Sequence, residues 1–259
     1  MKTQIMNFVN RMCKYIPTRK AKRLTKKYTR KLLGIKDYSL YSGERQTATD
    51  LEEIRKDHIE RYQMAVDFLK KHGQKTEILN GYDVFCGIGY GSFMLSNHLK
   101  NAKIISIDGS QEAINLAQQF YQTGNITYRQ LFFPFELTEE HADFFVSLES
   151  LEHIKNDDLF LKLIQRTLKP GGILILSIPN AEKWKLEINA NHFHYRHYKP
   201  DELIEKLNTL HFELVQLYGQ DIYKMDSSGK MKESLDHHDM ELKLDYRGQC
   251  CIYIFRKIM

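Results

Sequence analysis

The sequence predicts an α/β fold in which a mostly parallel β-sheet carries helices on both faces. From about residue 82, short β-branched or aromatic runs alternate with amphipathic helical patterns, and this alternation is typical of such a sheet. A glycine-rich turn follows the first run, and an acid, Asp108, ends the second. The chain has 259 residues, 42% of them hydrophobic, which is enough for one large domain with a core of its own.

The individual elements follow from these runs, taken in chain order. A first helix is expected from about residue 50 to 71, before the sheet begins. The expected strands are Tyr82–Cys86, Lys103–Ile107, Ile126–Arg129, Asp143–Leu148, Ile173–Ile178, Phe212–Leu217 and Cys250–Phe255. Helices are expected between them at 91–99, 110–121, 156–167 and Glu202–Leu207. A long polar loop, about 221–248, separates the last two strands.

Composition excludes several classes of protein. The apolar and charged fractions are those of a globular chain rather than a disordered or fibrous one. No run approaches the 18 or more apolar residues of a membrane span, and the N-terminus lacks the apolar core of a secretory signal. The four cysteines fit neither a disulfide framework nor a zinc pattern, so we expect a reducing, cytoplasmic location.

The positive charge is concentrated at the N-terminus. Residues 1–36 contain twelve Lys or Arg and no acid, so subtracting +12 from the overall +5 leaves −7 for the other 223 residues. The apolar spacing within 1–36 indicates a helical arm. Such an arm either meets anionic lipid at the inner membrane surface or nucleic acid, or packs on its own domain or a second subunit. We expect a helical cap at 37–80 and the main domain at 81–259, with a substrate-side insertion at about 181–200.

The glycine-rich turn and the acid together indicate a nucleotide site. The turn reads Asp83-Val-Phe-Cys-Gly-Ile-Gly-Tyr-Gly91, and its glycines allow the backbone to approach a ligand closely. Asp108 lies 21 residues after Gly87, where a carboxylate can accept hydrogen bonds from both hydroxyls of a ribose. These residues alone fit either a dinucleotide oxidoreductase or an S-adenosylmethionine site.

Segments further along the chain favour an S-adenosylmethionine site. The chain resembles the class I S-adenosylmethionine-dependent methyltransferases over roughly residues 40–258. The matching segments are Asp83–Gly91, Ser106–Ser110, Asp143–Ile154, Leu168–Gly172 and Ser177–Asn180. The resemblance implies a Rossmann-like sheet of seven strands, of which the last, Cys250–Phe255, runs antiparallel.

The resemblance also implies cofactor contacts. Gly87 and Gly89 would lie against the cofactor, Asp108 would hold the ribose, and Asp83 would orient the methionine amino group. The implied cofactor residues further include Gly109, Ser110 and Leu148. Two departures stand out: Phe85 replaces the usual first glycine, and no acid for adenine follows Tyr128, so we expect adenine to rest on Phe132.

Segments upstream resemble a narrower group. Ser42–Arg45, His58–Tyr62 and Cys86–Ser92 are similar to bacterial methyltransferases associated with surface-polysaccharide synthesis. Arg45 or Arg61 could pair with the cofactor carboxylate, because a guanidinium matches that group bidentately. A purely structural ion pair is an equal alternative for either arginine.

Four residues form a candidate metal site. Glu149, Glu152 and His153 follow the fourth strand at i, i+3 and i+4, which on a helical turn places them on one face. His194, in the tract Asn191–Tyr198, can reach the same edge. Two carboxylates and two imidazoles suit a divalent ion such as Mg²⁺ or Mn²⁺. Without metal, His153 or His194 would be the general base, and His192 and His197 are expected at the surface.

This ligand set resembles that of small-RNA terminal 2′-O-methyltransferases, and ubiquinone-pathway O-methyltransferases carry a similar Glu-x-x-Glu-His. The leading hypothesis is O-methylation of a sugar in a nucleotide-linked or polymer-bound glycan, such as capsule or lipopolysaccharide. The second is RNA 2′-O-methylation, although the chain shows no recognisable RNA-binding module. The third is a noncatalytic subunit that binds cofactor. The sequence does not predict an oligomeric state.

Overall fold

A computed structural model describes residues 46–72 and 78–259. The basic arm at 1–36, Arg45 and Cys13 therefore lie outside the described residues. Residues 48–259 form one compact unit built on an eight-stranded sheet, with the strand order β3-β2-β1-β4-β5-β10-β6-β9. The neighbours from β3 to β5 are all parallel, whereas β10 is antiparallel to β5 and β6.

All seven expected strands are present. Their bounds are β1 Leu79–Val84, β2 Ala102–Asp108, β3 Ile126–Gln130, β4 Ala142–Ser147, β5 Leu168–Pro179, β6 Phe212–Gln220 and β10 Cys250–Lys257. The sheet has eight strands rather than the expected seven, because the two-residue strand β9, Lys243–Leu244, pairs with the outer edge of β6. A strand of two residues has no alternation that a sequence pattern could reveal.

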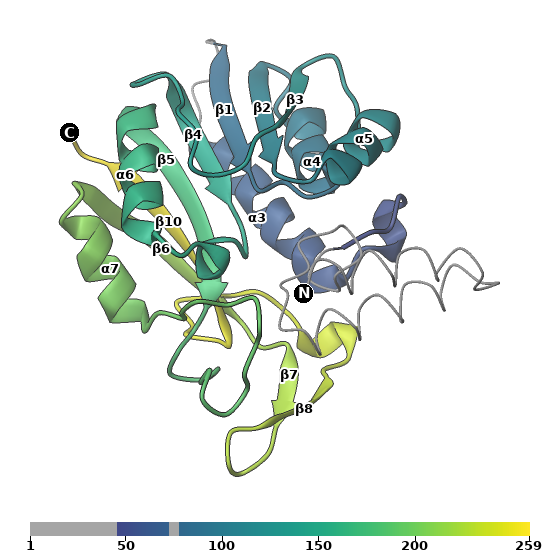
Figure 1. Cartoon of the computed structure of the whole chain (residues 1–259), viewed down its shortest axis with the longest axis vertical. Helices are drawn as coiled ribbons and strands as arrows, with labels where there is room; N and C mark the ends of the chain where they lie inside the picture. Colours follow the sequence, from purple (N-terminus) through teal and green to yellow (C-terminus); the bar gives the residue numbers. More distant parts are fainter. Residues whose placement is uncertain (1–45, 73–77) are drawn as a thin grey trace, which may run out of the picture. The chain divides into compact units, whose positions relative to one another are not determined.

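Helices cover both faces of this sheet. Helix α3 (Lys56–His72), α4 (Tyr90–His98) and α5 (Gln111–Phe120) lie on one face, and α6 (Asp157–Thr167) and α7 (Pro200–Asn208) on the other (Figure 1). The expected helix from residue 50 is divided: a 3₁₀ turn, η2 (Leu51–Glu53), is capped by Asp50 and separated from α3 by the extended residue Ile54. A core cluster joins α6 and α7 to one sheet face through Phe160, Leu163 and Leu203.

The segment 221–248 is not a featureless loop. It contains a hairpin of β7 (Tyr223–Met225) and β8 (Met231–Ser234), a 3₁₀ turn η4 (His237–Asp239), and β9. The hairpin is held to the 181–199 segment, because the Asn189 side chain donates to the Gly229 carbonyl and accepts from the Met231 amide. Two insertions that are distant in sequence thus form one structure beside the sheet.

The strand order reverses between β1 and β4. The chain adds β2 and β3 on one side of β1 and then returns to place β4 on its other side. Ligands of such sheets bind outside the carboxyl ends of the strands at this reversal. The glycine-rich turn follows β1, and the segment Glu149–His153 follows β4, so both lie at the reversal.

The described helices do not include one long and apolar enough to cross a membrane. The three described cysteines, Cys86, Cys250 and Cys251, are free thiols, which agrees with the absence of a disulfide framework among them.

Gly91 provides a test of the packing between α3 and α4. A methyl group at this position would lie 2.0–2.3 Å from three ring atoms of Tyr62. Overpacking typically costs about 1–3 kcal/mol, which exceeds the gain of at most about 1 kcal/mol in helix propensity. We expect Gly91→Ala to lower the free energy of unfolding by about 1–2 kcal/mol in urea titrations.

Gly124→Ala is the matched control, because a methyl group there meets no atom of residues 46–72 or 78–259 within 4 Å. Its free energy of unfolding should stay within about 0.5 kcal/mol of the wild type. A Gly91→Ala protein as stable as this control would contradict the packing described here.

Candidate functional site

The turn after β1 keeps the backbone conformation of a glycine-rich turn. Phe85, Gly87 and Gly89 all have positive φ, at 64°, 58° and 85°. Phe85 therefore adopts, as a bulky residue, the left-handed conformation that glycine favours. Its ring packs on Phe160, with the ring centroids 5.3 Å apart. The backbone thus accommodates the replacement of the first glycine, while the new side chain joins the core beside the turn.

The two glycines serve different purposes. A methyl group at Gly89 would lie 2.7 Å from the Tyr128 hydroxyl and 2.8 Å from the Ala117 Cβ, so Gly89 lets the turn approach β3 and α5. A methyl group at Gly87 would meet no atom of the described residues within 4 Å. The space in front of Gly87 is therefore open to a ligand.

Asp108 faces this turn from the end of β2. Its Oδ2 accepts a hydrogen bond from the Gly87 amide at 3.0 Å, and its Oδ1 accepts one from the Ser110 amide at 2.8 Å. Both bonds fix the carboxylate beside the open space at Gly87. Because each carboxylate oxygen has two lone pairs, the group retains acceptor capacity for the hydroxyls of a ribose.

Asp83 is the buried acid of the site. Its Oδ2 accepts a hydrogen bond from Ser92 at 2.5 Å, and its Oδ1 accepts one from Tyr62 at 3.1 Å. Burial raises the pKa of Asp83 to about 6, although both hydrogen bonds oppose this change. An ammonium group brought close to this carboxylate would favour its ionised form.

Phe132 lies beside the end of β2 and is 70% exposed. A methyl group at Gly109 would lie 2.9 Å from two atoms of this ring, so the ring lies against Gly109. Ser110 begins α5 and caps it by accepting a hydrogen bond from the Ala113 amide. Leu148 is half-buried at the end of β4, where its carbonyl accepts from the Ser150 hydroxyl. These residues line the carboxyl ends of neighbouring strands.

Arg61 is engaged in a buried network of protein groups. Its side chain is 1% exposed and donates through Nε to Gln220 at 2.9 Å and through Nη2 to Asp57 at 3.1 Å. Its Nη1 lies 3.5 Å from Glu149 Oε2. Arg61 therefore forms ion pairs with Asp57 and Glu149. A structural ion pair was the alternative to a contact with the cofactor carboxylate.

Glu149 does not lie on a helical turn with its neighbours. It has a φ of 50° and precedes a 3₁₀ turn, η3 (Leu151–His153). Its Oε1 accepts hydrogen bonds from the Ser177 hydroxyl at 3.0 Å and the Cys250 thiol at 2.9 Å. Burial opposes ionisation, but Arg61 and the Cys250 hydrogen bond outweigh it and lower the pKa of Glu149.

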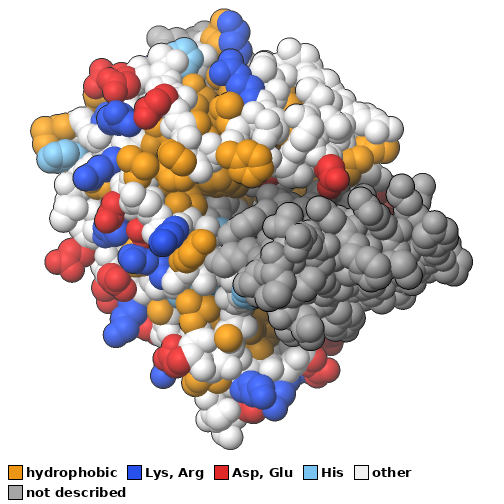
Figure 2. Space-filling model, viewed as in Figure 1, with side chains coloured by type: hydrophobic (Ala, Val, Ile, Leu, Met, Phe, Trp, Pro, Cys, Tyr) orange, Lys and Arg blue, Asp and Glu red, His pale blue; other side chains and the backbone are white. Residues whose placement is uncertain are grey.

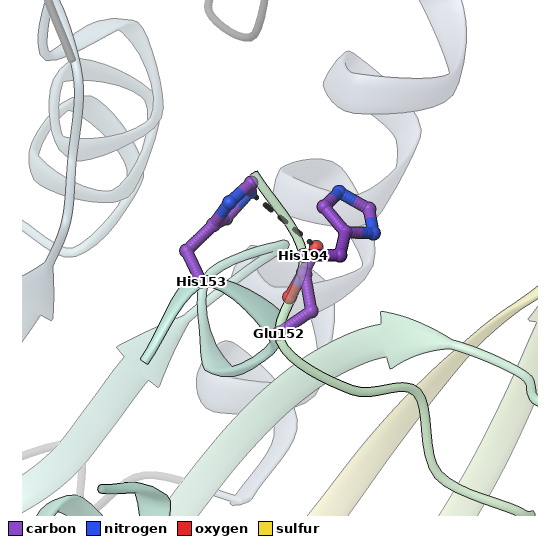
Figure 3. A group of neighbouring side chains, drawn as sticks. All are labelled: Glu152, His153 and His194. Atoms are coloured by element: carbon purple, nitrogen blue, oxygen red, sulfur yellow. Dashed lines mark ion pairs between the residues drawn. The ribbon is translucent and has the colours of Figure 1, made fainter. Parts of the chain in front are cut away.

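The expected i, i+3, i+4 geometry is therefore wrong for Glu149, because the left-handed residue turns its side chain toward Arg61. The structure instead brings together three of the four expected ligands. One ligand atom from each of Glu152, His153 and His194 lies within 4.8 Å of the others. Figure 3 shows the Glu152 carboxylate between the two imidazoles in this view.

Local contacts position this group. Glu152 is 1% exposed, and its Oε1 lies 3.8 Å from His153 Nε2, while its backbone carbonyl accepts from the Tyr195 amide. The two imidazole rings are perpendicular, with centroids 4.7 Å apart. The Tyr195 contact therefore joins η3 to the 181–199 segment, and no sequence spacing could have revealed it.

Sequence reasoning missed two further histidines near the site. His58 Nδ1 lies 3.2 Å from the Tyr90 hydroxyl, and burial together with Arg61 lowers the pKa of His58 to about 4, so its imidazole is neutral. His197 was expected at the surface but is half-buried, with its Nε2 2.6 Å from His194 Nδ1. Burial also lowers the pKa of His197. His192 is exposed, as expected.

Comparison with known proteins identifies the family. Residues 76–239, more than half of the chain, match the family model described as a methyltransferase domain. The chain belongs to the class I S-adenosylmethionine-dependent methyltransferases. Their cofactor is S-adenosylmethionine. The methyltransferase fold, activity and cofactor expected from the sequence are thereby confirmed.

Two relatives are similar to this chain in sequence. A Rickettsia bellii "Ubiquinone biosynthesis O-methyltransferase" is 27% identical over 180 residues, which cover 64% of this chain and 74% of the relative. A Mycolicibacterium smegmatis "Probable S-adenosylmethionine-dependent methyltransferase" is 26% identical over 136 residues, 52% of each protein. The chain thus spans about half the length of the mycobacterial relative.

Solved structures share the fold. An S-adenosylmethionine-dependent methyltransferase from Mesorhizobium loti superposes with a TM-score of 0.53 and 15% identity, covering 75% of this chain and 99% of that one. The [4+2]-cyclase SpnF superposes with a TM-score of 0.51 and 16% identity, covering 75% and 80%. Because the same fold is found in a cyclase, fold alone does not fix the reaction.

Gly87 provides a test of the cofactor site in this methyltransferase. Gly87→Ala adds a methyl group that meets no atom in the described part of the chain but projects into the open space beside Asp108. We expect the affinity for S-adenosylmethionine, measured by calorimetry, to fall at least tenfold. The strain of alanine at φ 58° should cost about 1–2 kcal/mol of stability.

Gly171→Ala is the matched control, since Gly171 also has positive φ and open space but lies in β5 away from the carboxyl edge. It should lose similar stability and keep its cofactor affinity. Equal loss of affinity in both variants would place the cofactor elsewhere.

Asp83 provides a test of pH dependence. Between its ordinary pKa near 3.8 and the folded value of about 6, the folded protein holds a proton that the unfolded chain has released. The contribution of Asp83 to the free energy of unfolding should therefore fall by about 3 kcal/mol as pH rises through this range and then level off. The wild-type free energy of unfolding minus that of Asp83→Asn, from denaturant titrations at pH 4–7, should show this decline.

The neutral His58 contributes equally to both proteins and cancels in the difference between them. Parallel curves for the wild type and Asp83→Asn would show that the Asp83 carboxyl is not raised in the folded state.

Proposed function

We propose that this methyltransferase transfers a methyl group to a hydroxyl oxygen with the help of a divalent metal ion. The first candidate acceptor is a sugar with adjacent hydroxyls in a nucleotide-linked or polymer-bound surface glycan. The observation that carries the proposal is the group of Glu152, His153 and His194 at the same sheet edge as the glycine-rich turn.

The cofactor site fits S-adenosylmethionine. The open space at Gly87, the fixed carboxylate of Asp108 and the buried carboxylate of Asp83 suit a ligand with ribose hydroxyls and an ammonium group. When bound, the cofactor supplies an electrophilic methyl group. Asp108 would hold the ribose, Asp83 would orient the amino group, and the Phe132 ring would offer a flat surface for adenine.

The three-residue group also fits a metal. One carboxylate and two imidazoles are suitable ligands for Mn²⁺ and related ions, and three protein ligands leave positions open for an acceptor. A bound ion would lower the pKa of an acceptor hydroxyl. Glu152 is held by its burial and by the Tyr195 contact, so it would define the position of the site.

The proposed acceptor follows from two features. The segments His58–Tyr62 and Cys86–Ser92 resemble methyltransferases of surface-polysaccharide synthesis, and a metal with open positions suits two adjacent oxygens. A ubiquinone precursor is the second candidate, because the relative named for ubiquinone biosynthesis aligns over 64% of this chain. Both candidates involve methylation of oxygen.

RNA is a weaker candidate. The chain outside residues 1–36 carries a net charge of −7, and acidic and basic side chains are interspersed over the described part of the face in Figure 2. Binding to the phosphate backbone would require a concentration of positive charge. The arm at 1–36 would supply such charge, or would contact the inner membrane surface. A noncatalytic role is the outcome if no acceptor is labelled.

Metal binding tests the centre of the proposal. We expect purified protein to bind Mn²⁺ in calorimetry and Glu152→Gln to weaken binding about 100-fold or more, because loss of a ligand exceeds the roughly 10–100-fold loss for residues that only orient one. Circular dichroism would check that Glu152→Gln is folded. His192→Ala is the control with unchanged affinity, since His192 is exposed and outside the group.

Glu149→Gln distinguishes three ligands from four. It should keep Mn²⁺ affinity within a few-fold if Glu149 serves Arg61 rather than the metal. A loss equal to that of Glu152→Gln would restore Glu149 to the ligand set. A wild-type protein that binds no divalent ion would overturn the metal site.

The acceptor is tested with labelled S-adenosylmethionine and a panel of nucleotide sugars, a simple aromatic 1,2-diol and short RNA, each with Mn²⁺, Mg²⁺ or chelator. Label on a sugar that is lost with chelator supports the proposal. Label on sugar despite chelator retains the acceptor but replaces the metal with a histidine base. Label only on the aromatic diol or only on RNA would overturn the sugar assignment in favour of that class.

A further inference from the structure

A chain of four hydrogen bonds runs through His194 and ends on backbone groups. The Phe193 amide donates to Asn191 Oδ1 at 2.9 Å, and Asn191 Nδ2 lies 3.0 Å from His194 Nε2. His194 Nδ1 lies 2.6 Å from His197 Nε2, and His197 Nδ1 lies 2.7 Å from the Trp184 carbonyl oxygen. All these residues belong to the 181–199 segment.

The two ends of this chain fix its direction. A backbone amide can only donate, so the Asn191 oxygen faces Phe193 and its amino group faces His194. His194 Nε2 is therefore an acceptor without a proton. At the other end, a carbonyl can only accept, so His197 Nδ1 carries a proton. The central bond is then satisfied with both imidazoles neutral when His194 Nδ1 donates to His197 Nε2.

We infer that His197 and Asn191 are positioning residues that hold His194 with its proton on Nδ1 and a lone pair on Nε2. This inference deepens the proposed function. The use of that lone pair as a metal ligand rests on the proposed function. A metal ligand needs an unprotonated ring nitrogen, and residues that bond the other nitrogen commonly fix the tautomer. The same lone pair would be required of a general base.

The surroundings indicate orientation rather than proton transfer. The chain ends at the Trp184 carbonyl, which has no proton to give and does not readily accept one. Trp184 is buried, and its ring centroid lies 5.3 Å from that of His197 and 5.8 Å from that of His194, so it packs beside both rings. A ligand at His194 Nε2 must replace the Asn191 hydrogen bond, because both use the same lone pair.

The tautomer of His194 is measurable in the full-length, metal-free protein. Long-range ¹H–¹⁵N spectra distinguish protonated from unprotonated ring nitrogens, and His194→Asn would identify the His194 signals by their disappearance. We expect a protonated Nδ1 and an unprotonated Nε2 in the wild type. An Nε2 that carries the proton would overturn the inference without involving metal or acceptor.

Two substitutions of His197 separate positioning from packing. His197→Phe retains a ring but neither hydrogen bond. Asn191 still holds the tautomer in the metal-free protein, but a metal at Nε2 displaces Asn191, so loss of the His197 acceptor should weaken Mn²⁺ binding about 10–100-fold. His197→Gln offers an oxygen to His194 and an amino group to Trp184, and it should retain the tautomer and stay within about threefold of wild-type affinity. Wild-type Mn²⁺ affinity in His197→Phe would overturn the inference.

Failure of the inference and failure of the proposed metal site are distinguishable. A wild-type protein with the expected tautomer but no affinity for Mn²⁺ would refute the metal and sustain the positioning of His194. Wild-type Mn²⁺ affinity in both His197→Phe and His197→Gln would sustain the metal and refute the positioning role.

Discussion

The site depends on one constraint, which is that parallel strands end at the same edge of a sheet. The order β3-β2-β1-β4-β5 places the ends of β1, β2 and β4 side by side where the order reverses. Each strand then delivers a different group to that edge: the open turn at Gly87, the carboxylate of Asp108, and the segment that begins with Glu149. No long-range side-chain pairing is needed to bring these groups together, because backbone hydrogen bonding of the sheet does so.

A buried charge network connects helix α3 to this edge. Arg61 reaches Asp57 on its own helix, Gln220 at the end of β6 and Glu149 after β4. Removing one partner from such a network would leave an uncompensated charge in the interior, which is far more costly than an exposed ion pair is stabilising. The network therefore ties the helix to two strands, β6 and β4, and also diverts Glu149 from the neighbouring group of Glu152, His153 and His194.

The side of the site away from the cofactor turn is built from two insertions. The segment 181–199 brings His194 to Glu152 through the Tyr195 amide, and the β7–β8 hairpin is bonded to it through Asn189. Neither insertion belongs to the alternating pattern of the sheet. A common fold can thus carry different chemistry, as the likeness to both a methyltransferase and a cyclase illustrates.

The sequence by itself determined the seven main strands, the order of helices between them, and the glycine-rich turn and acid that meet at the candidate cofactor site, because hydrophobic periodicity and glycine placement are local properties. It also singled out Glu152, His153 and His194. It misjudged Glu149 and His197, since their roles depend on Arg61, 88 residues before Glu149, and on a turn that brings His197 back to Trp184. The short strands β7 to β9 were equally hidden, because each is defined by its partner rather than by its own pattern. Only the tertiary structure decided these points, because buried side chains form their hydrogen bonds with groups that sequence spacing does not bring together.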